Sequence, residues 1–205
     1  MSSSLWSQSS GENLISSDPS TRPVWSVALL ASDKTRSLAM EVAKQTISAS
    51  YLLGNPEVIV ETLHVAALVA AALGELKEAA EWSSESESLA KVLKDVASVD
   101  DASVVSAHVK LLAGEYAACA QCAEQLAKLH GDGLEDFKVL SWSTVLGMHA
   151  RIGLEDMNEA RELAAVAPDL LVYAAYLNDS SKANLLAACT LVDLYTHNLS
   201  IQPLA

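Results

Sequence analysis

The chain has 205 residues, of which 51% are hydrophobic, and these are mostly Ala, Leu and Val, with a single Phe. A chain of this length can bury a substantial core as one domain or as one array of repeats, and the composition favours helices. Its 13 Lys and Arg stand against 26 Asp and Glu, a net charge of -13, so we expect no binding to nucleic acid or to an anionic membrane surface.

The first 25 residues are rich in serine and show neither a helical nor a strand period. Such a segment has too little apolar surface to fold alone, so we expect a flexible N-terminal arm over 1–25 and one helical domain over 26–205. The arm lacks the apolar run of a secretory signal, and the chain holds an odd number of cysteines, three. We therefore expect reduced thiols, a cytoplasmic location and no membrane span.

The clearest helix boundary is Gly54-Asn55-Pro56-Glu57. Glycine suits the position just past a helix end, asparagine is a preferred N-cap, and proline is favoured at the first helical position. This pattern predicts one helix from about Ser32 or Asp33 to Leu53 and a second from Pro56 to Leu73.

Further along the chain, glycines and polar runs interrupt the apolar pattern. Asp100 or Asp101, in the run SVDDAS, is predicted to cap one helix, and Asp132, with Glu135 three residues later, to cap another. The helices expected after Gly74 cover 76–96, the segment from the Asp100–Asp101 cap to Gly114, 116–130, 134–152, 155–166, 169–177 and 180–199. The total is about nine helices.

No stretch combines period-two alternation with the β-branched residues of strands. Connections of two to five residues make consecutive helices antiparallel neighbours. We therefore predict an all-α fold of stacked helical hairpins, in which neighbouring hairpins supply the core that no hairpin can bury alone. A compact, non-repeating helical bundle is the alternative.

Three glycines recur at nearly equal intervals along the chain: Gly74, Gly114 and Gly153. With the residues around them, they resemble the middle of a tetratricopeptide repeat, where small residues let paired helices cross closely. The matching positions are Leu76, Ala79, Tyr116, Cys119, Trp142 and Val145. The resemblance covers about residues 57–167 and implies a short right-handed α-solenoid. The glycine interval is longer than the usual repeat of that family, which leaves another α-solenoid as an alternative.

The resemblance also implies that the first helix of each hairpin lines a concave groove for a protein partner. The family's groove positions correspond here to Glu61, His64, Leu68, His108, Leu111, Leu112, Ser143, Thr144 and Arg151. These positions lack the Lys and Asn set with which some members bind a terminal carboxylate. The groove would therefore suit an apolar helix or extended segment, and the acidic surroundings would favour a basic partner.

Several motifs also have a chemical interpretation, but a structural one is favoured for each. Cys119-Ala-Gln-Cys122 has the spacing of redox and zinc sites, yet it lies within an expected helix. Glu61 and His64 have the spacing used by di-iron bundles, but no second copy exists. The acidic loop around Asp132 is expected to cap a helix, and SSESES at 83–88 to be a solvent-exposed helix face, with phosphorylation of its serines as the alternative.

We therefore expect a non-enzymatic interaction scaffold or adaptor, a subunit or assembly factor of a larger complex, without cofactor or metal. The alternative is a helical enzyme or ligand sensor with a closed pocket between hairpins, in which His64, His108 or His149 acts as acid or base. A third alternative is homo-oligomerisation through exposed aromatic side chains, for which the candidates are Trp82, Tyr173, Tyr176 and Tyr195.

Overall fold

The structure is a computed structural model and describes residues 35–129, 137–172 and 179–200. Within these ranges it has eight helices and no strand, which confirms the all-α prediction for this part of the chain. The expected arm over 1–25, the Asp132 cap, and the tyrosines at 173 and 176 lie outside the described residues.

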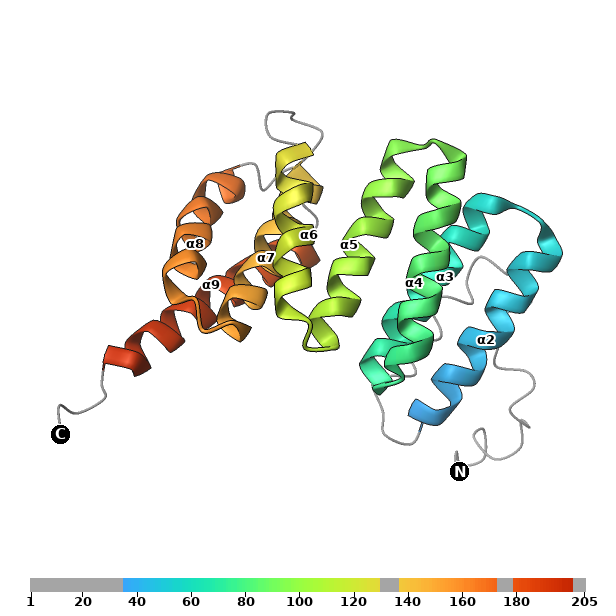
Figure 1. Cartoon of the computed structure of the whole chain (residues 1–205), viewed down its shortest axis with the longest axis horizontal. Helices are drawn as coiled ribbons and strands as arrows, with labels where there is room; N and C mark the ends of the chain where they lie inside the picture. Colours follow the sequence, from blue (N-terminus) through green and yellow to red (C-terminus); the bar gives the residue numbers. More distant parts are fainter. Residues whose placement is uncertain (1–34, 130–136, 173–178, 201–205) are drawn as a thin grey trace, which may run out of the picture.

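The helices lie side by side in sequence order, with α2 at one end of the row and α8 and α9 at the other (Figure 1). Their bounds are α2 (Arg36–Leu53), α3 (Pro56–Leu73), α4 (Leu76–Leu93), α5 (Val96–Leu112), α6 (Tyr116–Leu129), α7 (Phe137–Gly153), α8 (Met157–Val172) and α9 (Asp179–Ser200). Neighbouring helices pack in sequence order, as in a helical repeat.

The first five of these helices begin at evenly spaced positions: 36, 56, 76, 96 and 116. A residue with positive φ follows each of the first four: Gly54 (68°), Gly74 (83°), Lys94 (56°) and, one residue later, Gly114 (77°). A left-handed residue turns the chain out of a helix while its N–H still reaches the last carbonyls, as the Gly74 N–H does at Ala71 O (3.1 Å). The interval between the glycines at 74 and 114 therefore spans two helices.

The α4–α5 boundary differs from the prediction. Asp95, not Asp100 or Asp101, caps α5, and its carboxylate accepts hydrogen bonds from the Ser98 hydroxyl (2.6 Å) and the Ser98 N–H (3.0 Å). These two bonds hold the pKa of the Asp95 carboxyl below its usual value. Asp100 is buried inside α5. The cap prediction was wrong because Lys94 occupies the left-handed position, so no glycine marks the turn.

The segment after α7 also differs. Instead of two helices over 155–166 and 169–177, a single helix, α8, runs through Pro168 to Val172. An internal proline removes one backbone hydrogen bond. The apolar face nevertheless continues past it, since Ala167 and Leu170 on either side are both buried in the same core cluster. Packing of that face outweighs the local preference for a break.

The third glycine of the sequence pattern is not equivalent to the first two. Gly153 is the last residue of α7, and the positive φ of this turn falls on Glu155 (60°). A Cβ at Gly153 would lie 2.6 Å from the Tyr116 ring. Close approach of α6, and not a left-handed backbone, therefore requires glycine here.

The helices form two layers. In addition to their sequence neighbours, α3, α5, α7 and α9 pack on one another in that order, whereas the even-numbered helices do not pack on each other to a comparable extent. Small buried side chains allow the odd-numbered helices to approach closely: Ala66, Ala67, Ala70, Ala102, Ala107 and Ala150. We call the odd-numbered helices the inner layer and the even-numbered helices the outer layer.

Polar side chains link the outer helices α2 and α4. The Tyr51 hydroxyl donates a hydrogen bond to the Glu85 carboxylate (2.5 Å), and Lys44 pairs with Glu78 (3.8 Å). Burial, with the contribution of the Glu85 carboxylate, raises the pKa of Tyr51 to about 12. Exposed pairs of this kind add little stability, whereas consecutive helices pack extensively on one another along the stack.

Among the described helices, α3 alone is long and apolar enough to span a membrane by length and composition, with a mean hydropathy of 1.6. Half of it is buried inside the structure, where it packs on α2, α4 and α5. The core helices of water-soluble proteins can have the same length and hydropathy.

Candidate interaction surface

An open hollow of about 680 Å³ lies among the second half of the helices. Its lining residues are mostly apolar or aromatic and come from α5 to α9: Leu111, Tyr116, His149, Ile152, Gly153, Glu155, Met157 and Tyr195. Tyr195, on α9, is 50% exposed and Glu155 is also exposed. The surface therefore combines apolar walls with one carboxylate.

Of the nine residues that the sequence pattern selects for a groove, Leu111 lines this hollow. His108, one turn earlier on α5, is half-buried, and its ring lies 6.3 Å from the Trp142 ring of α7, centroid to centroid. Leu112 is exposed on the same helix. The end of α5 therefore contributes Leu111 to the hollow.

The other predicted residues lie in different surroundings. On α3, Glu61 is exposed, whereas His64 and Leu68 are half-buried, and Leu68 packs on a core cluster. Ser143 and Thr144 on α7 are buried, and their hydroxyls donate to the carbonyl of Leu140 at 2.9 and 2.8 Å. A partner cannot reach these two hydroxyls without opening the core.

The ninth residue, Arg151, connects three elements of the fold. Its guanidinium contacts Glu124 on α6 (2.5 Å), Glu159 on α8 (2.5 Å) and Asp156 in the turn between α7 and α8 (3.6 Å). The side chain is 20% exposed. A planar guanidinium with five donors suits such a multiple contact, so Arg151 acts as a structural link.

We expect Arg151→Gln to lower the free energy of unfolding by roughly 1 kcal/mol, because three partly exposed carboxylates would lose their common counter-charge. The effect should shrink at about 1 M NaCl, where screening weakens both the lost attraction and the new repulsion. Urea denaturation at low and high salt measures both. Lys77→Gln, at the exposed Lys77–Glu81 pair, is the matched control and should change little; an equal loss in the two variants would contradict the linking role.

The charges of His108 and His149 interact across α5 and α7. Burial lowers the pKa of both, and the nearby His149 charge lowers that of His108 further. Both imidazoles are therefore kept neutral at neutral pH, and the His108 ring packs beside the Trp142 ring of α7.

We expect acidification to destabilise the fold through this pair. Above pH 6.5, the ordinary pKa of histidine, the imidazoles are neutral in both the folded and the unfolded protein. As the pH falls below 6.5, the unfolded chain binds protons first, because the pKa values of both histidines are lowered in the folded protein. Stability is therefore lost until the pH falls below those lowered pKa values. Urea midpoints at about pH 7.5 and 5.5 should fall more in the wild type than in the His108→Gln/His149→Gln variant; identical shifts would contradict this.

Within the Cys119–Cys122 motif, Cys119 has the surroundings of a structural thiol. Cys119 is fully buried, its thiol donates weakly to the Leu146 carbonyl (3.8 Å), and burial raises its pKa to about 11. A thiol held in its protonated form is a poor nucleophile and metal ligand. Within the described ranges, no three His, Cys, Asp or Glu side chains gather as a metal site.

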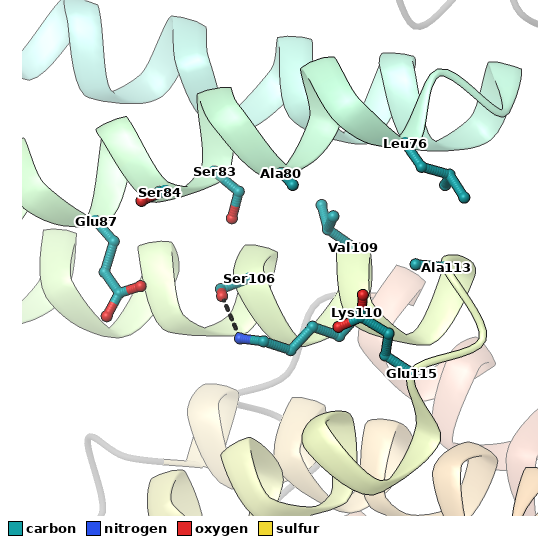
Figure 2. Close-up of a pocket in the computed structure, with 10 residues that line it drawn as sticks. All are labelled: Leu76, Ala80, Ser83, Ser84, Glu87, Ser106, Val109, Lys110, Ala113 and Glu115. Atoms are coloured by element: carbon teal, nitrogen blue, oxygen red, sulfur yellow. Dashed lines mark hydrogen bonds between the residues drawn. The ribbon is translucent and has the colours of Figure 1, made fainter.

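A second cavity, which the sequence patterns did not indicate, lies between α4 and α5 (Figure 2). The prediction that the whole SSESES segment is a solvent-exposed helix face was wrong, because Ser83 and Ser86 are buried, whereas Ser84 and Ser88 are exposed. Side chains three positions apart lie on the same face of a helix, so Ser83 and Ser86 both point into the structure. The cation of the cavity, Lys110, stands among apolar residues in the sequence, and no local spacing relates it to serines on another helix.

No family model matches the chain, and no curated protein matches it.

Proposed function

We propose that the protein is a non-enzymatic interaction scaffold or adaptor, a subunit or assembly factor of a larger complex in the cytoplasm. Its partner is a protein that inserts an apolar helix or extended segment into the hollow lined by Leu111, Ile152 and Tyr195. The described helices would belong to a short right-handed α-solenoid of tetratricopeptide type with about nine helices.

The hollow itself is the observation that supports this proposal most. Its volume of about 680 Å³ accommodates several side chains of a partner, and large apolar and aromatic walls are typical of the centres of protein interfaces. Five successive helices contribute to it, so its shape is set by packed secondary structure and little ordering is needed on binding.

The charge of the chain favours a basic partner. With a net charge of -13, the surface attracts cationic segments and raises their association rate. Glu155, which lines the hollow, would place a carboxylate beside the inserted segment. An apolar segment flanked by Lys or Arg fits both features.

Affinity purification with matched variants tests the proposal. Tyr195→Asp places a charge in the hollow, and Leu112→Asp places one at the exposed end of α5, next in sequence to Leu111; these side chains are 50% and 45% exposed. The control is Val92→Asp, on α4, where the side chain is 77% exposed. We expect a stoichiometric partner with the wild type and the control, and at least about tenfold less with the first two variants. Equal recovery in all four, or no stoichiometric partner, would overturn the proposal.

One observation favours the alternative, a helical enzyme or ligand sensor. His149 lines the hollow together with Glu155, and His108 is close enough for its charge to interact with that of His149. Acid–base catalysis works best where water is excluded, and this hollow is open, so we place it second. Comparing small molecules consumed from a cell extract by the wild type and by His149→Gln would separate the two functions, since a scaffold changes none.

A further inference from the structure

The cavity between α4 and α5 has a volume of about 340 Å³. In Figure 2, α4 contributes Ser83, Ser84 and Glu87 from one side, and α5 contributes Ser106 and Lys110 from the other. A smaller hollow of about 110 Å³ continues from it toward α6 and shares Glu87, Ser106 and Lys110. None of its lining residues belongs to the interaction surface described above, so the site is independent of the proposed function.

Lys110 provides the cation of this cavity. Its ammonium donates to Ser106 Oγ (2.8 Å) and to Cys122 Sγ (3.4 Å). An ammonium has three N–H donors, and no carboxylate of a described residue lies within ion-pair distance of it. One N–H and the uncompensated charge therefore remain for a ligand.

Two serine hydroxyls lie on the same cavity. Ser106 accepts a hydrogen bond from Lys110, which leaves its own proton to donate. Ser83 is only 4% exposed, and its Oγ is buried without a hydrogen-bond partner; Figure 2 shows it pointing from α4 across the gap toward Ser106. A buried, unsatisfied hydroxyl costs stability, and that cost is removed when a ligand accepts its proton.

The rest of the cavity limits the ligand. Both helices contribute apolar residues to the lining: Leu76 and Ala80 come from α4, and Val109 and Ala113 from the end of α5. Two carboxylates also line the cavity: Glu87, which is paired with Lys91 (2.7 Å), and the exposed Glu115. Any anion in the cavity would meet one cation and two carboxylates, of which Glu87 is already paired. The single charge of a carboxylate is repelled less there than the two charges of a phosphate, and Lys110 alone can balance it.

We infer that this cavity binds a small organic carboxylate with an apolar body. The carboxylate oxygens accept hydrogen bonds from Lys110 Nζ and from the hydroxyls of Ser106 and Ser83, and the apolar body packs on Leu76 and Val109. An ammonium group on the same ligand, as in an apolar amino acid, would lie within the field of Glu87 and Glu115.

Amide NMR titrations of the isotope-labelled full chain test this inference. The probes are isocaproate, leucine, the neutral isocaproamide and inorganic phosphate, each up to about 10 mM, the weak range expected of ligands with few atoms. We expect isocaproate or leucine to shift signals of α4 and α5 around the cavity, and isocaproamide and phosphate to bind at least about tenfold more weakly. Tighter binding of leucine than of isocaproate would assign the ammonium to the acidic side chains. No shift with either carboxylate, or equal binding of the amide or of phosphate, would overturn the inference.

Variants separate binding from folding. Lys110→Met should weaken carboxylate binding at least about tenfold. Lys77→Met removes an exposed lysine of α4 whose partner, Glu81, does not line the cavity, and it should leave the dissociation constant within about twofold. Ser83→Ala should weaken binding and yet raise the thermal midpoint of the free protein, because an unsatisfied hydroxyl is removed. A Lys110→Met variant that is folded by circular dichroism and binds as the wild type does would also overturn the inference.

Discussion

Replacing Leu146 by Ala is expected to lower the free energy of unfolding by about 2–5 kcal/mol. Leu146 lies in α7, is 1% exposed, and belongs to a core cluster whose other members are small. They are Ala107, Cys119, Ala120, Ala123 and Ala150. Short side chains that are fixed to three helices cannot move to fill the space, so a cavity remains. Urea or guanidinium denaturation measures the loss.

Leu112→Ala is the matched control, because Leu112 is 45% exposed and its truncation should cost less than about 1 kcal/mol. The loss at Leu146 should also be local. Since each helix contacts only nearby helices of the stack, amide protection should fall more in α5–α7 than in α2–α3. A loss at Leu146 no larger than that at Leu112 would contradict the packing of α6 on α7.

Helix boundaries were predictable where the sequence carries a local signal. At Gly54–Asn55–Pro56, the glycine has positive φ, and Asn55 Oδ1 accepts hydrogen bonds from the N–H groups of Glu57 (3.0 Å) and Val58 (3.5 Å). Each contact spans only a few residues, so the residue types alone define the turn. The C-terminal end of α2, both ends of α3 and the start of α4 follow the prediction for this reason.

The same rules failed where another residue type occupies the special position. Lys94 lies midway in the sequence between Gly74 and Gly114, and it has the left-handed backbone of both. A lysine side chain gives no turn signal. The glycines alone therefore indicate one helical hairpin between Gly74 and Gly114, and the boundary between its two helices was predicted from the polar run SVDDAS. The even spacing of the helix starts at 36, 56, 76, 96 and 116 shows that the repeating unit is one helix, and the same spacing applied to the sequence would have placed the turn at Lys94.

The candidate site was less predictable, because it depends on how each helix is rotated in the stack. The family positions carried over to α7 select Ser143 and Thr144, which are buried, whereas His149 and Ile152 of the same helix line the hollow. One residue changes the direction of a helical side chain by about 100°, so a small error of register exchanges core and surface. Only the packing of α7 on its neighbours fixes that rotation.

Gly153→Ala is expected to lower the free energy of unfolding by about 1–3 kcal/mol, the usual cost of overpacking. Alanine is the better helix former by roughly 1 kcal/mol, so a loss would mean that crowding outweighs propensity. The added Cβ would lie 2.6 Å from Cγ and Cδ1 of Tyr116 and 2.7 Å from its Cδ2. These ring atoms are close to the backbone of α6, so the start of α6 must move away from α7 or the ring must turn into the hollow.

Gly147→Ala on the same helix is the matched control. There the nearest atom to an added Cβ is Leu163 Cδ1 at 3.0 Å, the far end of a flexible side chain, and Ala123 Cβ follows at 3.8 Å. Leu163 can yield slightly, so this variant should be as stable as the wild type or somewhat more stable. Urea denaturation of both variants gives the comparison, and a Gly153→Ala protein as stable as Gly147→Ala would contradict the close approach of α6 and α7. Because Tyr116 lines the hollow, a scaffold that uses this surface should also lose partner affinity with Gly153→Ala and keep it with Gly147→Ala.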